Sequence, residues 1–118
     1  MKAAVLDKQG EEIKIYRDVD SIEPRAGEVK VRVKYCSLCH SDASVKSGVM
    51  GELSGPIILG HEAAGIVHSV GAGVAHLQPG DHVALVAAPP CGTCYFFPRN
   101  EHSLCVDGQG INTHAPPE

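Results

Sequence analysis

Residues 28–35 alternate charged and apolar side chains without interruption, and this pattern limits the fold more than any other feature of the chain. Successive side chains of a β-strand point to opposite faces of the sheet, so the alternation places three valines and Tyr35 on one face. An α-helix has no two-residue period. The segment therefore predicts a half-buried strand whose valines and tyrosine pack on a core.

Short apolar stretches bounded by Gly, Pro or Asp predict four more strands, at residues 3–6, 13–16, 65–70 and 82–87. Only residues 41–46, ended by Gly48, favour a helix, and a helix this short is not stable by itself. With 4% aromatic residues and no Trp, the core must consist of Val, Ile, Leu and Ala. We expect a mainly β fold, a small barrel with short helices over residues 1–105, followed by a polar tail at 106–118.

The overall composition excludes several classes of partner. A chain of 118 residues, 43% hydrophobic and 20% charged, fits one globular domain. Ten basic and 14 acidic side chains, with a formal charge of -4, provide no positive field for nucleic acid. No stretch approaches the roughly 20 apolar residues of a membrane span, and Asp7 and Lys8 interrupt the start too early for a signal peptide. We expect no nucleic-acid or membrane partner and a cytoplasmic location.

Five cysteines in a chain without an export signal favour metal binding or thiol chemistry over a disulfide framework. Cys39 is followed by His40, and His61 by Glu62, each pair at a predicted strand or turn boundary where side chains can converge. Alone, each would be an ordinary buried cysteine or a solvated histidine. Together, thiolate and imidazole favour zinc.

Cys91, Cys94 and Cys105 form a second group. A Cys-x-x-Cys turn that contains glycine commonly offers two thiolates to one tetrahedral ion. A redox pair is a weaker interpretation because no βαβ pattern surrounds the motif.

Cys36 and Cys39 permit two other interpretations. Together with His40 they match the c-type haem attachment pattern, although that attachment normally follows export. Joined to Cys91 and Cys94 they would make a four-cysteine zinc site, although the interval between the pairs exceeds the roughly 15 to 20 residues usual for such sites. The residues alone leave both alternatives open.

The stretch Gly60-His61-Glu62-Ala63-Ala64-Gly65 resembles the zinc signature of the medium-chain dehydrogenase/reductase family, in its zinc-dependent alcohol dehydrogenase branch. Cys39-His40-Ser41-Asp42 before it and Pro79-Gly80-Asp81-His82-Val83 after it match in the same order, over roughly residues 1–105. The resemblance implies an amino-terminal GroES-like catalytic domain. It also implies NAD(P)-dependent interconversion of small alcohols and aldehydes.

The resemblance implies roles for residues at the matching positions. Cys39 and His61 correspond to two of the three protein ligands of the catalytic zinc, and Glu62 to a carboxylate just behind the ion that tunes it or briefly binds it. Asp42 corresponds to the carboxylate that orients the His61 ring. Ser41 corresponds to the hydroxyl that starts the exit of the alcohol proton.

Other matching positions concern the cofactor and the proton relay. His40 occupies a position that approaches the cofactor pyrophosphate in relatives. Many relatives complete the relay with a histidine where this chain has Ser44, which is no base at neutral pH.

The second cysteine group matches the structural zinc lobe of the family, C-x₂-C-x₂-C-x₇-C, with one departure. Cys91, Cys94 and Cys105 are in place, but the third position is Phe97. Three thiolates do not close a structural zinc site, which normally has four protein ligands. One hypothesis is that His102 replaces the missing thiolate.

The largest departure from the family is length. The 118 residues contain no G-x-G-x-x-G dinucleotide motif, no Rossmann domain and no third catalytic ligand. We therefore expect a truncated catalytic domain that is inactive by itself, and the alternative is a non-catalytic GroES-like zinc-binding module. Missing strands would expose apolar sheet edges, which predicts self-association.

Overall fold

The computed structural model of the chain describes residues 1–106. The chain divides into two compact units, Met1–Leu85 and Val86–Glu118, and the described part of each is treated separately below. The first unit holds every strand of the described residues, and the second holds two turns of 3₁₀-helix. Apart from its first residue, the polar tail predicted at 106–118 lies outside the described residues.

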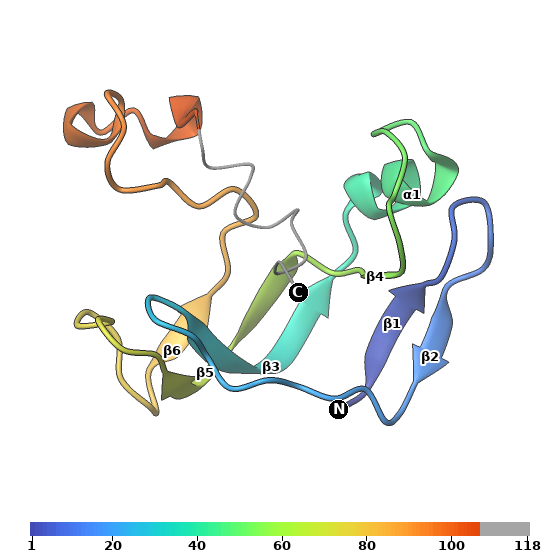
Figure 1. Ribbon diagram of the computed structural model, residues 1–118, viewed down its shortest axis with the longest axis horizontal. Helices are drawn as coiled ribbons and strands as arrows, with labels where there is room; N and C mark the ends of the chain where they lie inside the picture. Colours follow the sequence, from blue (N-terminus) through green and yellow to red (C-terminus); the bar gives the residue numbers. More distant parts are fainter. Residues whose placement is uncertain (107–118) are drawn as a thin grey trace. The chain divides into compact units, whose positions relative to one another are not determined.

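One sheet of the first unit contains three short antiparallel strands in the order β2-β1-β4 (Figure 1). They are β1 (Ala3–Leu6), β2 (Lys14–Tyr16) and β4 (Ile57–Ile58). Burial is concentrated on β1, where Ala3, Val5 and Leu6 are buried and Leu6 is fully enclosed. Leu6 pairs with Ile57 and Val5 with Ile58, so the chain returns to this sheet just before the residues of the candidate site.

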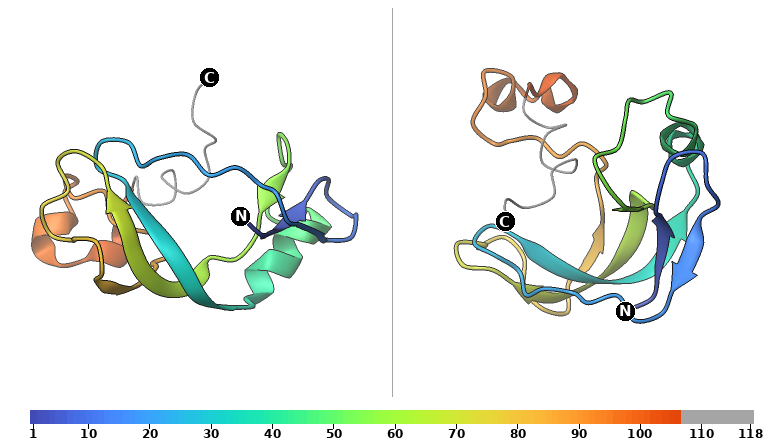
Figure 2. Two further views of the ribbon diagram at one scale, coloured as in Figure 1. Left: turned by 90° about the horizontal axis from the view of Figure 1, so that it is seen from below. Right: turned by 45° about the vertical axis from the view of Figure 1, so that its right-hand side comes forward.

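The second sheet has the order β3-β5-β6 and is also antiparallel. Its strands are β3 (Val29–Ser37), β5 (Glu62–Val70) and β6 (His82–Ala84). Strands β3 and β5 run side by side along their length (Figure 2). Their register pairs Ser37 with Glu62, so the end of β3 lies beside the start of β5. The residues just after β3 and just before β5 are thereby brought together.

The predicted strand at residues 28–35 forms, but the prediction that one whole face would be buried is wrong. Val31 is half-buried, whereas Val33 is 51% exposed and Tyr35 is 80% exposed. Two register shifts in the pairing with β5 interrupt the strict alternation of faces. The buried side chains of this sheet, Ala63 and Val67, lie on β5 instead.

The predicted helix forms as α1 (His40–Ser47), one residue longer at each end than expected. Cys39 is its N-cap residue, and Gly48 ends it in the left-handed conformation with φ 81°. Gln9 fixes the following loop: its Nε2 donates to Val45 O at 3.1 Å and to Gly51 O at 2.6 Å. None of the helices in the described part of the chain is long and apolar enough to cross a bilayer.

Candidate metal sites

Cys39, His61 and Glu62 converge at the junction that the register of β3 and β5 creates. Cys39 follows β3 by two residues, and His61 immediately precedes β5. One ligand atom from each residue, a sulfur, a ring nitrogen and a carboxylate oxygen, lies within 4.8 Å of the other two. The structure thus brings Cys39 together with two residues that follow it by more than 20 positions in the sequence. This donor set suits zinc.

Asp42 holds the two strongest candidate ligands. Its side chain is buried, with the residue 7% exposed. The backbone N–H of Cys39 donates to Asp42 Oδ2 at 3.2 Å, and His61 Nδ1 lies 3.3 Å from Asp42 Oδ1. Because Nδ1 faces this carboxylate, Nε2 is the ring nitrogen left for a metal. One buried carboxylate therefore fixes both the cysteine and the histidine.

The electrostatics of the group favour a thiolate. Hydrogen bonds from the Ser41 hydroxyl and backbone lower the pKa of Cys39, and the neighbouring His61 lowers it further. The pKa of His61 is raised, mainly by its hydrogen bond with Cys39 and also by the charge of Asp42. Ser41 Oγ lies 3.4 Å from Cys39 Sγ. The thiolate is the form of cysteine that binds metals.

The remaining residues of this region lie outside the group. His40 is exposed at the first position of α1, and Cys36 is exposed on β3. Ser44 is half-buried within α1, and its carbonyl oxygen accepts the N–H of Val49 at 3.1 Å. The sequence did not predict that Gln9 would hold the end of α1 and the loop after it. Its partners are 36 to 44 residues away, and no local pattern indicates them.

Replacing Asp42 by asparagine is expected to weaken zinc binding at Cys39 and His61 about 10- to 100-fold, the usual cost of changing a partner that orients a ligand. An amide keeps the shape but loses the charge facing the His61 ring. Competition with a chromophoric chelator measures the affinity, and the exposed Asp20→Asn serves as the control. Equal affinities of the two variants, both folded by circular dichroism, would remove Asp42 from the site.

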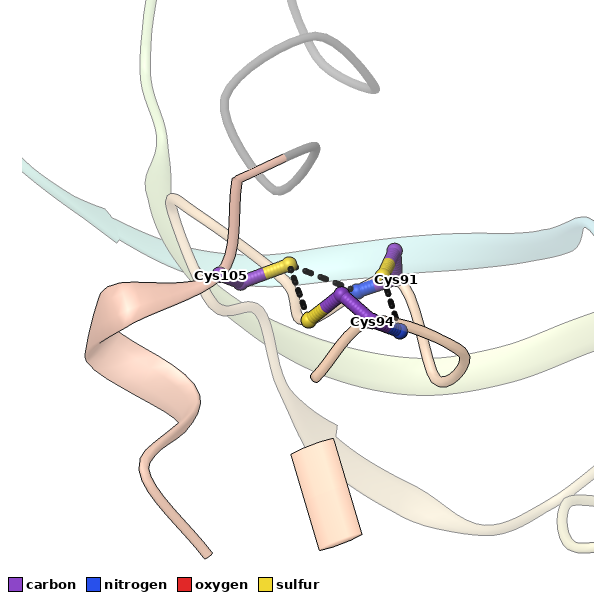
Figure 3. A group of neighbouring side chains, drawn as sticks. All are labelled: Cys91, Cys94 and Cys105. Atoms are coloured by element: carbon purple, nitrogen blue, oxygen red, sulfur yellow. Dashed lines mark hydrogen bonds between the residues drawn. The ribbon is translucent and has the colours of Figure 1, made fainter. Parts of the chain in front are cut away.

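Cys91, Cys94 and Cys105 form a second group in the other unit, with their sulfurs within 4.8 Å of one another (Figure 3). The N–H of Cys91 donates to Cys105 Sγ at 3.2 Å, and the N–H of Cys94 donates to Cys91 Sγ at 3.3 Å. Cys94 Sγ lies 3.8 Å from Cys105 Sγ. Cys91 and Cys94 thus converge on Cys105.

The structure does not bring His102 into this group. Its ring is stacked on Phe97, with centroids 5.0 Å apart and planes 17° from parallel. Phe97 begins η1 (Phe97–Arg99) and His102 begins η2 (His102–Leu104). Thr93 is a contributor that the sequence did not single out: its Oγ1 donates to Cys91 Sγ at 3.7 Å. Its position inside the Cys-x-x-Cys turn was the available signal.

Alkylation of the metal-free chain is expected to occur fastest at Cys91. Hydrogen bonds, first from the backbone and hydroxyl of Thr93 and then from the N–H of Cys94, lower the pKa of Cys91 to about 6. The thiolate should therefore persist at pH 7 and be lost as the pH falls through 6, whereas an ordinary thiol loses it near pH 8.5. Iodoacetamide labelling followed by peptide mass mapping at several pH values measures this. Thr93→Val keeps the backbone N–H and removes the hydroxyl, so a Cys91 profile unaffected by it would contradict the contribution of the hydroxyl.

Comparisons with known proteins agree with this fold. The family model described as "Alcohol dehydrogenase GroES-like domain" matches residues 25–115. The chain belongs to this family. The prediction of a mainly β, GroES-like fold is thereby confirmed, and within residues 1–106 every strand pair is antiparallel, with no βαβ unit.

Individual relatives extend the comparison. The chain is 45% identical over 115 residues to the probable S-(hydroxymethyl)glutathione dehydrogenase 1 of Schizosaccharomyces pombe, covering 93% of this chain and 30% of that relative. It is 45% identical over 104 residues to the class-3 alcohol dehydrogenase of Zea mays, covering 88% of this chain and 27% of that relative. The cobalt- and zinc-bound thermostable alcohol dehydrogenase from Pyrobaculum aerophilum aligns at a TM-score of 0.82 and 32% identity, covering 93% of this chain and 33% of that one. The chain therefore spans about 30% of the length of its relatives.

Proposed function

We propose that this chain supplies two of the three catalytic zinc ligands, Cys39 and His61, of an NAD(P)-dependent alcohol dehydrogenase. The supporting observation is the convergence of Cys39, His61 and Glu62 around the buried carboxylate of Asp42, in a chain of the alcohol dehydrogenase GroES-like family. A metal-binding role without catalysis would use the same ligands, but a hydroxyl beside them can also relay the proton of a bound alcohol. Ser41 supplies that hydroxyl, 3.4 Å from the Cys39 sulfur.

The residues present fit zinc, because a sulfur, an imidazole nitrogen and a carboxylate oxygen lie together. Bound zinc supplies a Lewis acid that lowers the pKa of a substrate hydroxyl. In this proposal Cys39 and His61 hold the ion, and the exposed Glu62 tunes it from one side. Asp42 keeps the His61 ring oriented for binding through Nε2.

Ser41 is the residue that we assign to proton movement. Its hydroxyl accepts the hydrogen bond of the substrate alcohol and directs the proton away from Cys39. Ser44 cannot take that proton as a base at neutral pH, so in this proposal the proton passes from Ser41 to solvent. His40 is exposed at the start of α1 and is assigned to the pyrophosphate of NAD(P) in the full-length protein.

The substrate class is a small alcohol or the corresponding aldehyde. Two relatives are described as an S-(hydroxymethyl)glutathione dehydrogenase and a class-3 alcohol dehydrogenase. The hydroxymethyl adduct that formaldehyde forms with glutathione is therefore the first substrate to test, beside simple primary alcohols. We keep the cytoplasmic location as a prediction.

A chimera tests the proposal. This chain would replace the matching 115-residue segment of the Schizosaccharomyces pombe relative, and alcohol-dependent formation of NADH or NADPH would be measured. We expect turnover by the chimera, none by the 118-residue chain alone, and none by a Cys39→Ser chimera. A folded chimera that contains zinc at Cys39 but shows no turnover with any of these substrates would favour the non-catalytic zinc-binding module.

The isolated chain is expected to self-associate. The outer strand β3 carries Val33 and Tyr35, which are 51% and 80% exposed, and Leu38 after it is 95% exposed. An outer strand with apolar side chains is a site for pairing with another chain. Light scattering over a concentration series measures the effect, and Val33→Lys should reduce it. A monomer at every concentration would contradict the prediction.

A further inference from the structure

The thiols of Cys91, Cys94 and Cys105 are arranged for a metal, but among the described residues the donor set is one ligand short of a closed zinc site. Backbone N–H groups donate to two of the three sulfurs, Cys105 at 3.2 Å and Cys91 at 3.3 Å. Such bonds stabilise the negative charge of a thiolate and fix its direction. The three sulfurs are therefore positioned before any ion arrives (Figure 3).

The one ligand position of the family pattern that lacks a cysteine is occupied by a side chain that cannot bind a metal. Phe97 stands where the relatives' pattern has its third cysteine, and its ring is stacked on that of His102. The stack holds the histidine that was the obvious replacement ligand. Within residues 1–106, the group that could hold an ion here consists of three sulfurs and no fourth donor.

We propose that this lobe binds one thiophilic divalent ion through Cys91, Cys94 and Cys105, and that its fourth coordination position accepts an exchangeable external ligand, a small thiol. A four-cysteine structural site is closed and inert toward such ligands, whereas an open position is the mark of a site that exchanges them. Soft thiolate donors select ions such as Zn²⁺, Co²⁺ and Cd²⁺. This inference concerns the second cysteine group and does not depend on the proposed catalytic function.

Cobalt titration tests the proposal, because tetrahedral Co²⁺ bound to thiolates has visible absorption that reports each change of ligand. The Cys39→Ser chain, prepared reduced and metal-free, isolates the second group. We expect one Co²⁺ per chain with a sulfur-to-cobalt charge-transfer band, and a shift of the spectrum when 2-mercaptoethanol is added. Absence of that band, or a spectrum that does not respond to the added thiol, would overturn the proposal.

Phe97→Cys is the decisive variant. It restores the four-cysteine pattern, so the fourth ligand becomes part of the chain and the affinity for zinc should rise about 100-fold or more. The spectrum of this variant should no longer respond to 2-mercaptoethanol. Phe97→Ser combined with His102→Ala removes the ring without adding a thiol or freeing the imidazole, and it should leave both the affinity and the response to thiol close to those of the parent.

His102→Ala separates the remaining alternative. If His102 leaves its stack on Phe97 to bind the ion, its removal will change the cobalt spectrum of the parent and make it responsive to added thiol. That result would make His102 the fourth ligand and overturn the proposal. We expect the spectrum and the response to thiol to be the same with and without this histidine.

Discussion

Replacing Cys39 by serine is expected to remove one zinc ion per chain. The thiolate is the softest donor of the group that includes His61 and Glu62, and a neutral hydroxyl is a poor substitute for it. The zinc affinity should fall by more than roughly 10- to 100-fold, which is the usual cost of changing a side chain that orients a ligand. Zinc content after dialysis, measured by elemental analysis, reports the result. The same substitution should abolish turnover in the chimera.

Cys36→Ser is the matched control for this prediction. Cys36 is exposed, stands three residues before Cys39 and lies outside the group that could hold an ion. Its replacement should leave the zinc content unchanged. Equal loss of zinc in both variants would show that Cys36 and Cys39 act as a pair, which is the requirement of the four-cysteine alternative that the sequence leaves open.

Local sequence patterns were sufficient to predict the elements that position the site. The alternation at residues 28–35 predicted β3, and Gly48 correctly marked the end of α1. The membership of the two thiol-containing groups was also predictable, because each has recognisable spacing. Within each group, the structure brings the ligand atoms close to one another. Their roles in binding and catalysis stay predictions until metal and activity are measured.

Features that depend on distant contacts could not be predicted in the same way. The exposure of Val33 and Tyr35 follows from which elements cover β3, and the strand's own alternation carries no information about that cover. The stack of Phe97 on His102 depends on how two short 3₁₀ turns lie against each other. The resemblance implied that Asp42 orients the His61 ring. It did not imply that Asp42 also accepts the Cys39 N–H, because that bond depends on where α1 begins.

Gly65→Ala is expected to destabilise the first unit by about 3 kcal/mol or more, at or above the upper end of the usual cost of overpacking. Gly65 lies buried in β5 between Val33 of β3 and Val83 of β6. A Cβ at this position would overlap the carbonyl group of Arg32 and come within 2.9 Å of Val31 Cγ1. Backbone cannot yield as a flexible side chain can, so β3 and β5 would have to move apart.

Because β3 and β5 bring Cys39 and His61 together, the Gly65→Ala variant should also lose zinc affinity, although it changes no ligand. Urea unfolding of the zinc-free chain measures the stability, and chelator competition measures the affinity. Gly55→Ala is the control, because a Cβ there meets nothing within 4 Å and the backbone is not left-handed. Its effect should stay within about 0.5 kcal/mol. Equal stability of the two variants would mean that β3 and β5 are not packed as closely as the structure places them.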